Sequence, residues 1–544
     1  MLFSSIAFLI FLMIFFPLFY LSGKKARPVV FMLSSLFFYM NTQTFYIAVT
    51  ILWILANFFF ISKLKNLSDK SLPERSSERS SERSSERSPE RSSERSSERS
   101  PERSSAEVLS AAKRKRKKFY FISGVCFNVF ALFFFKYTLF LTDNANSLIH
   151  IFIPSFSLPY LSILIPLGIS FITFKSISFL IEIYRGNYNK SVGLFNYAQY
   201  ILFFPGVLAG PIDRPGKLMP QLENLKQDLN INDLKKGLAF ILWGLFQKAV
   251  IADRIGLLIN GGLNNPENSS GGELLIFVFL YSVQIYCDFA GYSNIALGTA
   301  KLFGIDIMQN FERPYFSKSI GEFWRKWHIS LSSWLRDYLF LPLAYKYARK
   351  LTLRNLELKS VERYSYVMSV LITMLIAGFW HGAGWTFVFW GFLMAFYMIF
   401  GFYTKKFRRR FFAELFRKAG FKYNSKIKAV IQTSVNFLLI TFAWIFFRAE
   451  SFSSAIITIR KILMNPFENV SSVFSHEMIF AGFLVFVYFT IEYLQNKKPR
   501  IIKSSAKSIN AVPAVYRFVL YVFAAFFIFS AGYFSISQFI YAQF

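Results

Sequence analysis

Ala377-Gly378-Phe379-Trp380-His381-Gly382-Ala383-Gly384-Trp385 places one histidine in the middle of a long apolar run. An ionisable side chain at membrane depth is costly, so His381 is a functional-site candidate by default. The whole run, 366–403, is too long for one membrane pass and is interrupted by glycines at 378, 382 and 384. It therefore predicts two shorter helices that meet near His381, with backbone groups at the break available to a ligand.

Apolar residues dominate the rest of the chain as well. Hydrophobic residues make up 54% and aromatic residues 20% of the 544 positions, well above the level of ordinary soluble domains. Many runs approach the length that a membrane-spanning helix needs, and together they predict an all-α polytopic membrane protein with roughly ten to twelve passes. The candidate spans are 1–20, 28–62 (a pair of helices), 119–141, 161–182, 236–253, 272–290, 366–403 (broken), 427–447, 477–494 and 514–541.

The formal charge of +31 has a membrane explanation rather than a nucleic-acid one. Lys and Arg gather in short clusters between the apolar runs, which is the distribution that the positive-inside rule produces. This pattern places the clusters in the cytoplasm and the N-terminus outside, and no nucleic-acid partner is expected. Two cysteines and four scattered histidines offer neither a disulfide framework nor a metal site. The basic clusters are 24–27, 113–118, 346–354, 405–410 and 497–507.

Residues 73–104 are eight tandem tetrads of the form Ser/Pro-Glu-Arg-Ser. They contain no apolar residue, and nothing in them offsets the entropy that ordering would cost. We therefore expect residues 63–118 to form a disordered cytoplasmic loop, either a spacer or a tether for a partner. This loop would separate N-terminal transmembrane helices at 1–62 from a core at 119–544.

Two further apolar segments lack the pattern of a membrane span. Residues 319–338 begin with a capping box, Ser319 to Glu322, and continue as one amphipathic helix with an aromatic face and a basic face. Such a helix suits the cytoplasmic interface, and His328 falls at the edge between its two faces. Residues 199–222 are dense in glycine and proline, so they predict a re-entrant or interfacial loop.

Six short motifs follow one another along the chain. They are Phe204-Pro205-Gly206-Val207-Leu208-Ala209-Gly210-Pro211-Ile212-Asp213-Arg214, Asp288-Phe289-Ala290-Gly291-Tyr292-Ser293, Asn310-Phe311-Glu312-Arg313-Pro314-Tyr315, Glu322-Phe323-Trp324-Arg325-Lys326-Trp327-His328-Ile329-Ser330-Leu331-Ser332, Phe379-Trp380-His381-Gly382 and Trp444-Ile445-Phe446-Phe447-Arg448-Ala449. In this order and spacing they resemble the membrane-bound O-acyltransferase family, and within it the alginate O-acetylase-like branch. The resemblance covers nearly the whole chain apart from the tetrads, which have no counterpart. It implies re-entrant and interfacial helices, with the spans, around a central tunnel.

The resemblance also implies that His381 and His328 are catalytic. O-acylation from a thioester requires a base that removes a proton from a hydroxyl, and burial favours the neutral imidazole that can accept it. The alternative for His381 is a histidine hydrogen-bonded between helices. The alternative for His328 is an interfacial histidine that caps backbone or binds a headgroup. Many relatives carry a further histidine-glycine pair where this chain has Phe392-Leu393, so no role is assigned to that position.

Six other residues are candidates for contacts with substrate. The two arginines in and after the histidine motif could bind the phosphates of coenzyme A, or they could anchor the helix to lipid headgroups. The aspartate could orient a histidine or form a structural ion pair, and the asparagine could serve structure through hydrogen bonds. The tryptophans would help to keep the site dry. These candidates are Asp288, Asn310, Trp324, Arg325, Arg336 and Trp380.

The family resemblance extends to substrates and location. No bound cofactor is expected; an acyl thioester, acetyl-coenzyme A first, would donate from the cytoplasm to hydroxyls of an exported or cell-surface polysaccharide at the inner membrane. An extracytoplasmic acyltransferase would be a further partner. D-alanyl transfer to teichoic acid from a carrier protein stays open as an alternative. A membrane transporter is the alternative from another class, but it would predict a repeat with paired broken helices, which the sequence does not show.

Overall fold

The computed structural model contains helices and no strand within the residues that it describes. Seven of these helices are long and apolar enough to cross a membrane, which confirms the predicted all-α polytopic fold. Seven is fewer than the ten to twelve passes expected, and the predicted spans 161–182 and 236–253 are not among them. The seven helices are Tyr46–Ser68, Ser110–Phe152, Gly271–Leu302, Leu358–His381, Trp385–Tyr403, Lys426–Arg448 and His476–Asn496. The described residues are 3–69 apart from 4, 42 and 43; 101–225 apart from 162, 167, 208 and 209; 228–418; 425–497; 514–534; and 540.

A pair of amides inside the apolar layer joins two helices of the N-terminal third. Asn128 donates to Asn57 Oδ1 over 2.6 Å, and the Trp53 indole donates to Asn128 Oδ1 over 2.9 Å. Such bonds join helices where no water competes, and here they join α3 to α4. The helices of this part are α1 (Ile6–Leu21), α2 (Arg27–Met40), α3 (Tyr46–Asp69), α4 (Pro101–Phe152) and α5 (Ile169–Arg185).

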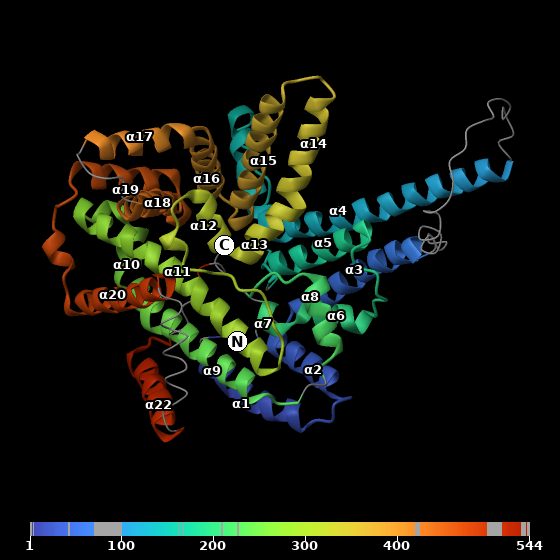
Figure 1. Cartoon of the computed structure of the whole chain (residues 1–544), viewed down its shortest axis with the longest axis horizontal. Coiled ribbons are helices and arrows are strands. Elements are labelled where there is room, and N and C mark those ends of the chain that lie inside the picture. Colours follow the sequence, from blue (N-terminus) through green and yellow to red (C-terminus); the bar gives the residue numbers. More distant parts are fainter. Residues whose placement is uncertain are drawn as a thin grey trace, which may run out of the picture.

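The predicted loop 63–118 is narrower than expected, because helices extend into it from both ends. Helix α3 continues to Asp69 and α4 begins at Pro101. Figure 1 shows α4 projecting well beyond the rest of the molecule. Residues 70–100, which hold most of the tetrads, lie outside the described part of the chain, so their predicted disorder stays a prediction.

The centre of the molecule is an antiparallel pair, α9 (Ile231–Leu245) and α11 (Gly271–Leu302) (Figure 1). Glycines allow the two backbones to touch: a Cβ on Gly298 would lie 2.5 Å from the Gly237 carbonyl oxygen, and one on Gly291 would lie 2.7 Å from that of Gly244. With 32 residues, α11 is about 48 Å long, which exceeds the hydrocarbon thickness of a bilayer. A π-helical turn (Phe246–Ala252) and α10 (Asp253–Asn264) continue from α9.

The two segments predicted not to span behave differently from one another. Residues 199–222 form short, largely buried pieces, namely part of α6 (Leu194–Leu202), α7 (Phe204–Val207) and α8 (Pro215–Glu223), as the glycine and proline content predicts. The single amphipathic helix expected over 319–338 is wrong. The chain instead forms α12 (Ile320–Lys326), a break at Trp327 and His328, α13 (Ile329–Leu335), a π-helical turn (Arg336–Phe340) and α14 (Leu341–Thr352).

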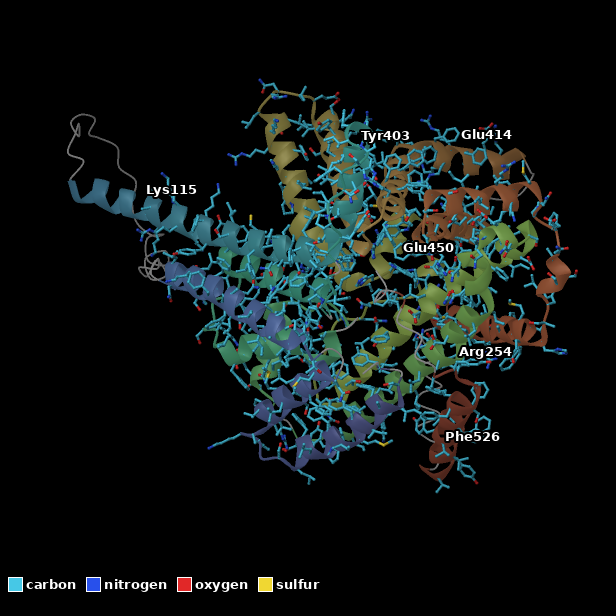
Figure 2. The ribbon with its side chains drawn as sticks, turned by 180° about the vertical axis from the view of Figure 1, so that it is seen from behind. Lys115, Arg254, Tyr403, Glu414, Glu450 and Phe526 are labelled. Atoms are coloured by element: carbon cyan, nitrogen blue, oxygen red, sulfur yellow. The ribbon has the colours of Figure 1, made fainter. Side chains whose placement is uncertain are left out.

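In the C-terminal part, α18 (Ser425–Arg448) and α19 (Phe452–Met464) pack against α11 (Figure 1). Arg254 on α10 donates to the Ala531 carbonyl oxygen over 2.8 Å and so holds the end of the last described helix; Figure 2 labels Arg254 and, on that helix, Phe526. The helices of this part are α15 (Leu358–His381), α16 (Trp385–Tyr403), α17 (Lys405–Lys418), α18 (Ser425–Arg448), α19 (Phe452–Met464), α20 (His476–Lys497) and α22 (Ala514–Ala531).

Candidate active site

The predicted break in the apolar run 366–403 is present. Helix α15 ends at His381 and α16 begins at Trp385, so three residues separate two antiparallel helices. Glycines bring the helices into contact: a Cβ on Gly378 would lie 2.3 Å from the Phe387 carbonyl oxygen, and one on Gly391 would lie 2.3 Å from that of Met374. Gly378, one of the glycines that interrupt the run, and Gly391 therefore set the close approach of its two arms.

Aromatic rings surround His381, which is 4% exposed. The ring centroid of Trp380 lies 4.7 Å from the imidazole centroid, that of Trp390 lies 5.1 Å away, and that of Phe447 lies 5.3 Å away. Trp390 and Phe447 meet the imidazole edge to face, at interplanar angles of 89° and 72°. This enclosure keeps bulk water from the imidazole, as the sequence-based hypothesis requires.

Helix α4 supplies the hydrogen-bond donors for the end of α15. Lys136 Nζ donates to the carbonyl oxygens of Trp380 over 2.6 Å and of His381 over 3.2 Å. The Tyr137 hydroxyl donates to the Phe379 carbonyl oxygen over 2.7 Å. The last carbonyls of a helix lack partners within it, and a cation is favourable at this end. Sequence reasoning did not assign Lys136, although a lysine inside the apolar run 119–141 was the available signal.

His328 lies at the break between α12 and α13 rather than on the edge of one helix. It is fully buried, and its backbone has a φ of 44°, a left-handed conformation that is uncommon for a side-chain-bearing residue. The neighbouring loop holds it there: the Ile329 amide donates to the Asn310 carbonyl oxygen over 2.8 Å, and the Glu312 amide donates to that of Lys326 over 3.0 Å.

Asn310 also reaches the His328 imidazole with its side chain. Its Oδ1 accepts from the Ser330 hydroxyl over 2.7 Å and lies 3.4 Å from His328 Nδ1, and its Nδ2 donates to the Ser293 hydroxyl over 3.0 Å. Because an amide oxygen only accepts, Nδ1 carries the proton in this arrangement and Nε2 is the basic nitrogen. Burial lowers the pKa of His328 to about 3, so the imidazole is neutral at physiological pH.

The structure brings the two histidines together across 53 positions of sequence (381 minus 328). The Trp380 ring neighbours both, at 4.7 Å from the His381 imidazole and 6.4 Å from that of His328. The resemblance implied two catalytic histidines but did not say that they share one site; the fold gives them that proximity.

Trp380 also lines an apolar cavity of about 570 Å³. Its walls come from α4, α5, α13 with the turn that follows, and α15. Within this wall the Phe174 ring lies 5.1 Å from that of Trp380, the neighbour of both histidines, and 4.3 Å from that of Trp334. Tyr338 also lines it, and Arg214 lies 4.4 Å above that ring. A cavity of this kind can hold an apolar or weakly polar chain with its reactive end near the histidines.

The remaining predicted residues lie at various places around this centre. Trp324 packs against Trp390, with ring centroids 5.9 Å apart, and so belongs to the aromatic surroundings of His381. Asp288 forms a buried ion pair with Lys248 Nζ at 2.6 Å, which is the structural alternative raised for it. Arg325 is exposed, and Arg336, 61% exposed, pairs with Asp337. The structure brings neither arginine into contact with the histidines.

Comparison with known proteins also indicates an acyltransferase. A model of the membrane-bound O-acyltransferase family matches residues 188–442, which include both histidines. The chain is 30% identical over 455 residues to a probable alginate O-acetylase, AlgI, of Pseudomonas putida, covering 83% of this chain and 78% of that one. It is 32% identical over 366 residues to the peptidoglycan O-acetyltransferase of Helicobacter pylori, covering 62% of this chain and 64% of that one.

A third relative carries a different acyl group in its name. The teichoic acid D-alanyltransferase of Streptococcus thermophilus is 33% identical over 230 residues, covering 41% of this chain and 54% of the relative. The long alignment with the alginate O-acetylase and the family match over the histidine-bearing core agree with the geometry described above. This chain therefore belongs to the membrane-bound O-acyltransferase family, in its alginate O-acetylase-like branch, and is an O-acyltransferase.

Proposed function

We propose that this O-acyltransferase transfers an acetyl group from acetyl-coenzyme A on the cytoplasmic side of the inner membrane to hydroxyls of an exported or cell-surface polysaccharide. The observation that carries the proposal is the pair of buried histidines, His381 and His328, held around one tryptophan at a break in a membrane helix. The relatives named as alginate and peptidoglycan O-acetylases support acetyl as the group and a glycan as the acceptor.

His381 is the general base in this mechanism. Its neutral imidazole accepts the proton of the acceptor hydroxyl while the hydroxyl oxygen attacks the carbonyl carbon of the thioester. The tetrahedral intermediate then collapses, the carbon–sulfur bond breaks, and the imidazolium returns the proton to the leaving thiolate. The products are an ester on the acceptor and a free thiol. The rings around His381 exclude water, which would otherwise hydrolyse the thioester.

His328 orients the reacting groups. With Nδ1 donating to Asn310, Nε2 is the acceptor nitrogen of the imidazole, so in this scheme it can hold the acceptor hydroxyl or pass on a proton. Because burial keeps the imidazole neutral, it places no positive charge next to the base. In this scheme the six predicted substrate contacts divide into two groups. The first group shapes the reaction centre and consists of Trp380, Trp324 and Asn310. The second group stays a set of candidates for substrate contacts away from the histidines and consists of Arg325, Arg336 and Asp288.

The test uses the purified full chain in detergent with acetyl-coenzyme A labelled in the acetyl group. Release or transfer of label is compared between wild type, His381→Ala and a matched control, His150→Ala. His150 lies on α4, is exposed, and hydrogen-bonds only to the Ser157 hydroxyl over 2.8 Å among the contacts described for it. Loss of a general base should lower the rate by about 10²–10⁴-fold. Equal activity in wild type and His381→Ala would remove His381 as the base and turn attention to His328.

The same assay separates the possible donors. The proposed donor is supported if the rate with acetyl-coenzyme A is higher than the rate with an acetyl thioester on an acyl-carrier protein. Activity with the carrier thioester alone, and above all with a D-alanyl carrier thioester, would favour the alternative suggested by the teichoic acid D-alanyltransferase relative. An extracytoplasmic acyltransferase is a proposed partner for the last step, so transfer to polysaccharide is measured with and without such an enzyme.

A further inference from the structure

A second cavity, of about 580 Å³, lies between α9, α11, α20 and the loop 309–313. Unlike the cavity at Trp380, it is lined by many polar side chains, among them Gln247 and Asn294, which are hydrogen-bonded to each other over 2.6 Å. The acyl transfer chemistry makes no use of it, because the rings of Phe289 and Phe311, 4.9 Å apart, stand between this cavity and His328.

A buried carboxylate forms the inner end of this cavity. Glu492 is only 5% exposed, and its Oε1 accepts from the Tyr286 hydroxyl over 2.6 Å and from the Tyr488 hydroxyl over 3.0 Å. Its Oε2 is buried and makes no hydrogen bond to any described residue. The charge of Arg313 acts on Glu492, but the two side chains form no ion pair within 4 Å. A buried carboxylate oxygen without a donor is costly, so the cavity favours a ligand that brings N–H donors and positive charge.

The other charges define the rest of the ligand. Lys236 and Arg313 line the same cavity, and Glu312 lies 3.7 Å from Arg313. Two cations and two carboxylates balance, which disfavours a purely anionic ligand and a purely cationic one. A zwitterion with an ammonium at Glu492 and a phosphate at Lys236 and Arg313 would satisfy both ends. We propose that this cavity binds a phosphoethanolamine headgroup.

Depth in the membrane indicates that the headgroup belongs to a lipid. The span of α20 ends at Asn496, so Glu492 lies four residues, or about 6 Å, inside it. This is the level at which headgroups meet the hydrocarbon. Next to the cavity, α9 and α20 present exposed apolar side chains along which acyl chains can lie: Leu238 is 48% exposed and Leu494 is 47% exposed. The occupant is therefore phosphatidylethanolamine.

Binding is tested on the purified full chain by native mass spectrometry after incubation with equal amounts of three lipids that share their acyl chains. Phosphatidylethanolamine carries the ammonium, phosphatidylcholine carries the same charge without N–H donors, and phosphatidylglycerol carries only the phosphate. Because Oε2 of Glu492 requires an N–H donor, wild type should retain phosphatidylethanolamine at least about tenfold over the other two. This readout does not depend on the proposed acetyl transfer.

Two variants and one control locate the site. Glu492→Gln should reduce the retention of phosphatidylethanolamine about tenfold. Glu477→Gln should leave this retention unchanged, because Glu477 lies at the opposite end of α20 and pairs with Arg254, which is labelled in Figure 2. Should Glu492→Gln not fold, Lys236→Met takes its place; Lys236 is exposed, and its loss should weaken retention several-fold without disturbing the fold.

Three results would overturn the proposal. Equal retention of the three lipids by wild type would remove the ammonium requirement. Unchanged selectivity in folded Glu492→Gln, or in Lys236→Met where that variant is used, would place any bound lipid elsewhere. Binding of soluble O-phosphoethanolamine as tightly as of the lipid would reassign the site to a soluble ligand.

Discussion

Replacing Lys136 by methionine tests how the end of α15 holds the proposed base. The lysine ammonium is the donor for the carbonyl oxygens of Trp380 and His381, at 2.6 and 3.2 Å. Methionine has a similar length and volume but no donor, so the packing of α4 is kept while both bonds are lost. No water is present at this depth to replace them.

The expected effect on stability is moderate and that on activity is large. Each carbonyl left without a partner costs about 1–3 kcal/mol, but the variant also avoids burying an ammonium, so the net loss of unfolding free energy should be about 1–3 kcal/mol. The end of α15 is then free to shift. A displacement of 1 Å at a reacting group can lower the rate about 10²-fold. We therefore expect kcat to fall about 10²-fold, with KM for acetyl-coenzyme A nearly unchanged.

The assay compares Lys136→Met with Lys115→Met, a lysine on the same helix that is exposed and lies 21 residues away (136 minus 115), or about 32 Å. Figure 2 shows Lys115 on the projecting end of α4. Lys136→Gln retains an N–H donor without the charge and separates the two contributions. A folded Lys136→Met protein with the kcat of wild type would refute the idea that this lysine positions His381.

Three further predictions concern stability, each measured as the midpoint of thermal unfolding in detergent. Gly391→Ala drives a methyl group against the Met374 carbonyl oxygen, so the free energy of unfolding should fall by about 1–3 kcal/mol. In the control Gly482→Ala the new methyl group meets no heavy atom within 4 Å, so the free energy of unfolding should not fall. Lys248→Met removes the cation from buried ion pairs with Asp253 and Asp288 and should cost about 3–5 kcal/mol; an unchanged midpoint would mean that the two carboxyl groups are neutral. Because the pKa of His328 is lowered to about 3 in the folded protein, the unfolded chain binds an extra proton below pH 6.5, and stability falls as pH falls. Between pH 7.5 and pH 5 this lowers the free energy of unfolding by about 2 kcal/mol, and His328→Gln should remove that pH-dependent loss.

The break at His381 and most of the spans were predictable from the sequence because they rest on local properties. Apolar length fixes a membrane helix, and the glycines at 378, 382 and 384 mark the place where the long run stops being one helix. The capping signal at Ser319 was equally local, and its side chain does accept from the Glu322 amide. Each of these features needs no knowledge of what lies across the bundle.

The break at His328 could not be predicted in this way. Its local pattern favours one amphipathic helix, and the left-handed backbone is imposed by pairing with the loop at Asn310, 18 residues earlier. The ion pair between Lys248 and Asp288 depends likewise on a π-helical turn that faces α11. In both cases the geometry depends on a segment that is distant in the sequence. The local sequence pattern therefore indicates candidate residues but not their backbone conformation or their partners.

A broken membrane helix cannot be understood from its own residues, because the break leaves carbonyl oxygens that the helix itself cannot supply with hydrogen-bond donors. The last carbonyls of α15 point into a region without water, so a break at His381 is stable only if another helix brings donors. Lys136 and Tyr137 of α4 bring them, although the lysine lies 245 residues from His381 in the chain. The lone lysine in the run 119–141 and the glycines in the run 366–403 are therefore two halves of one feature. Either half alone would be unstable in the membrane, and together they fix the histidine on which the proposed chemistry depends.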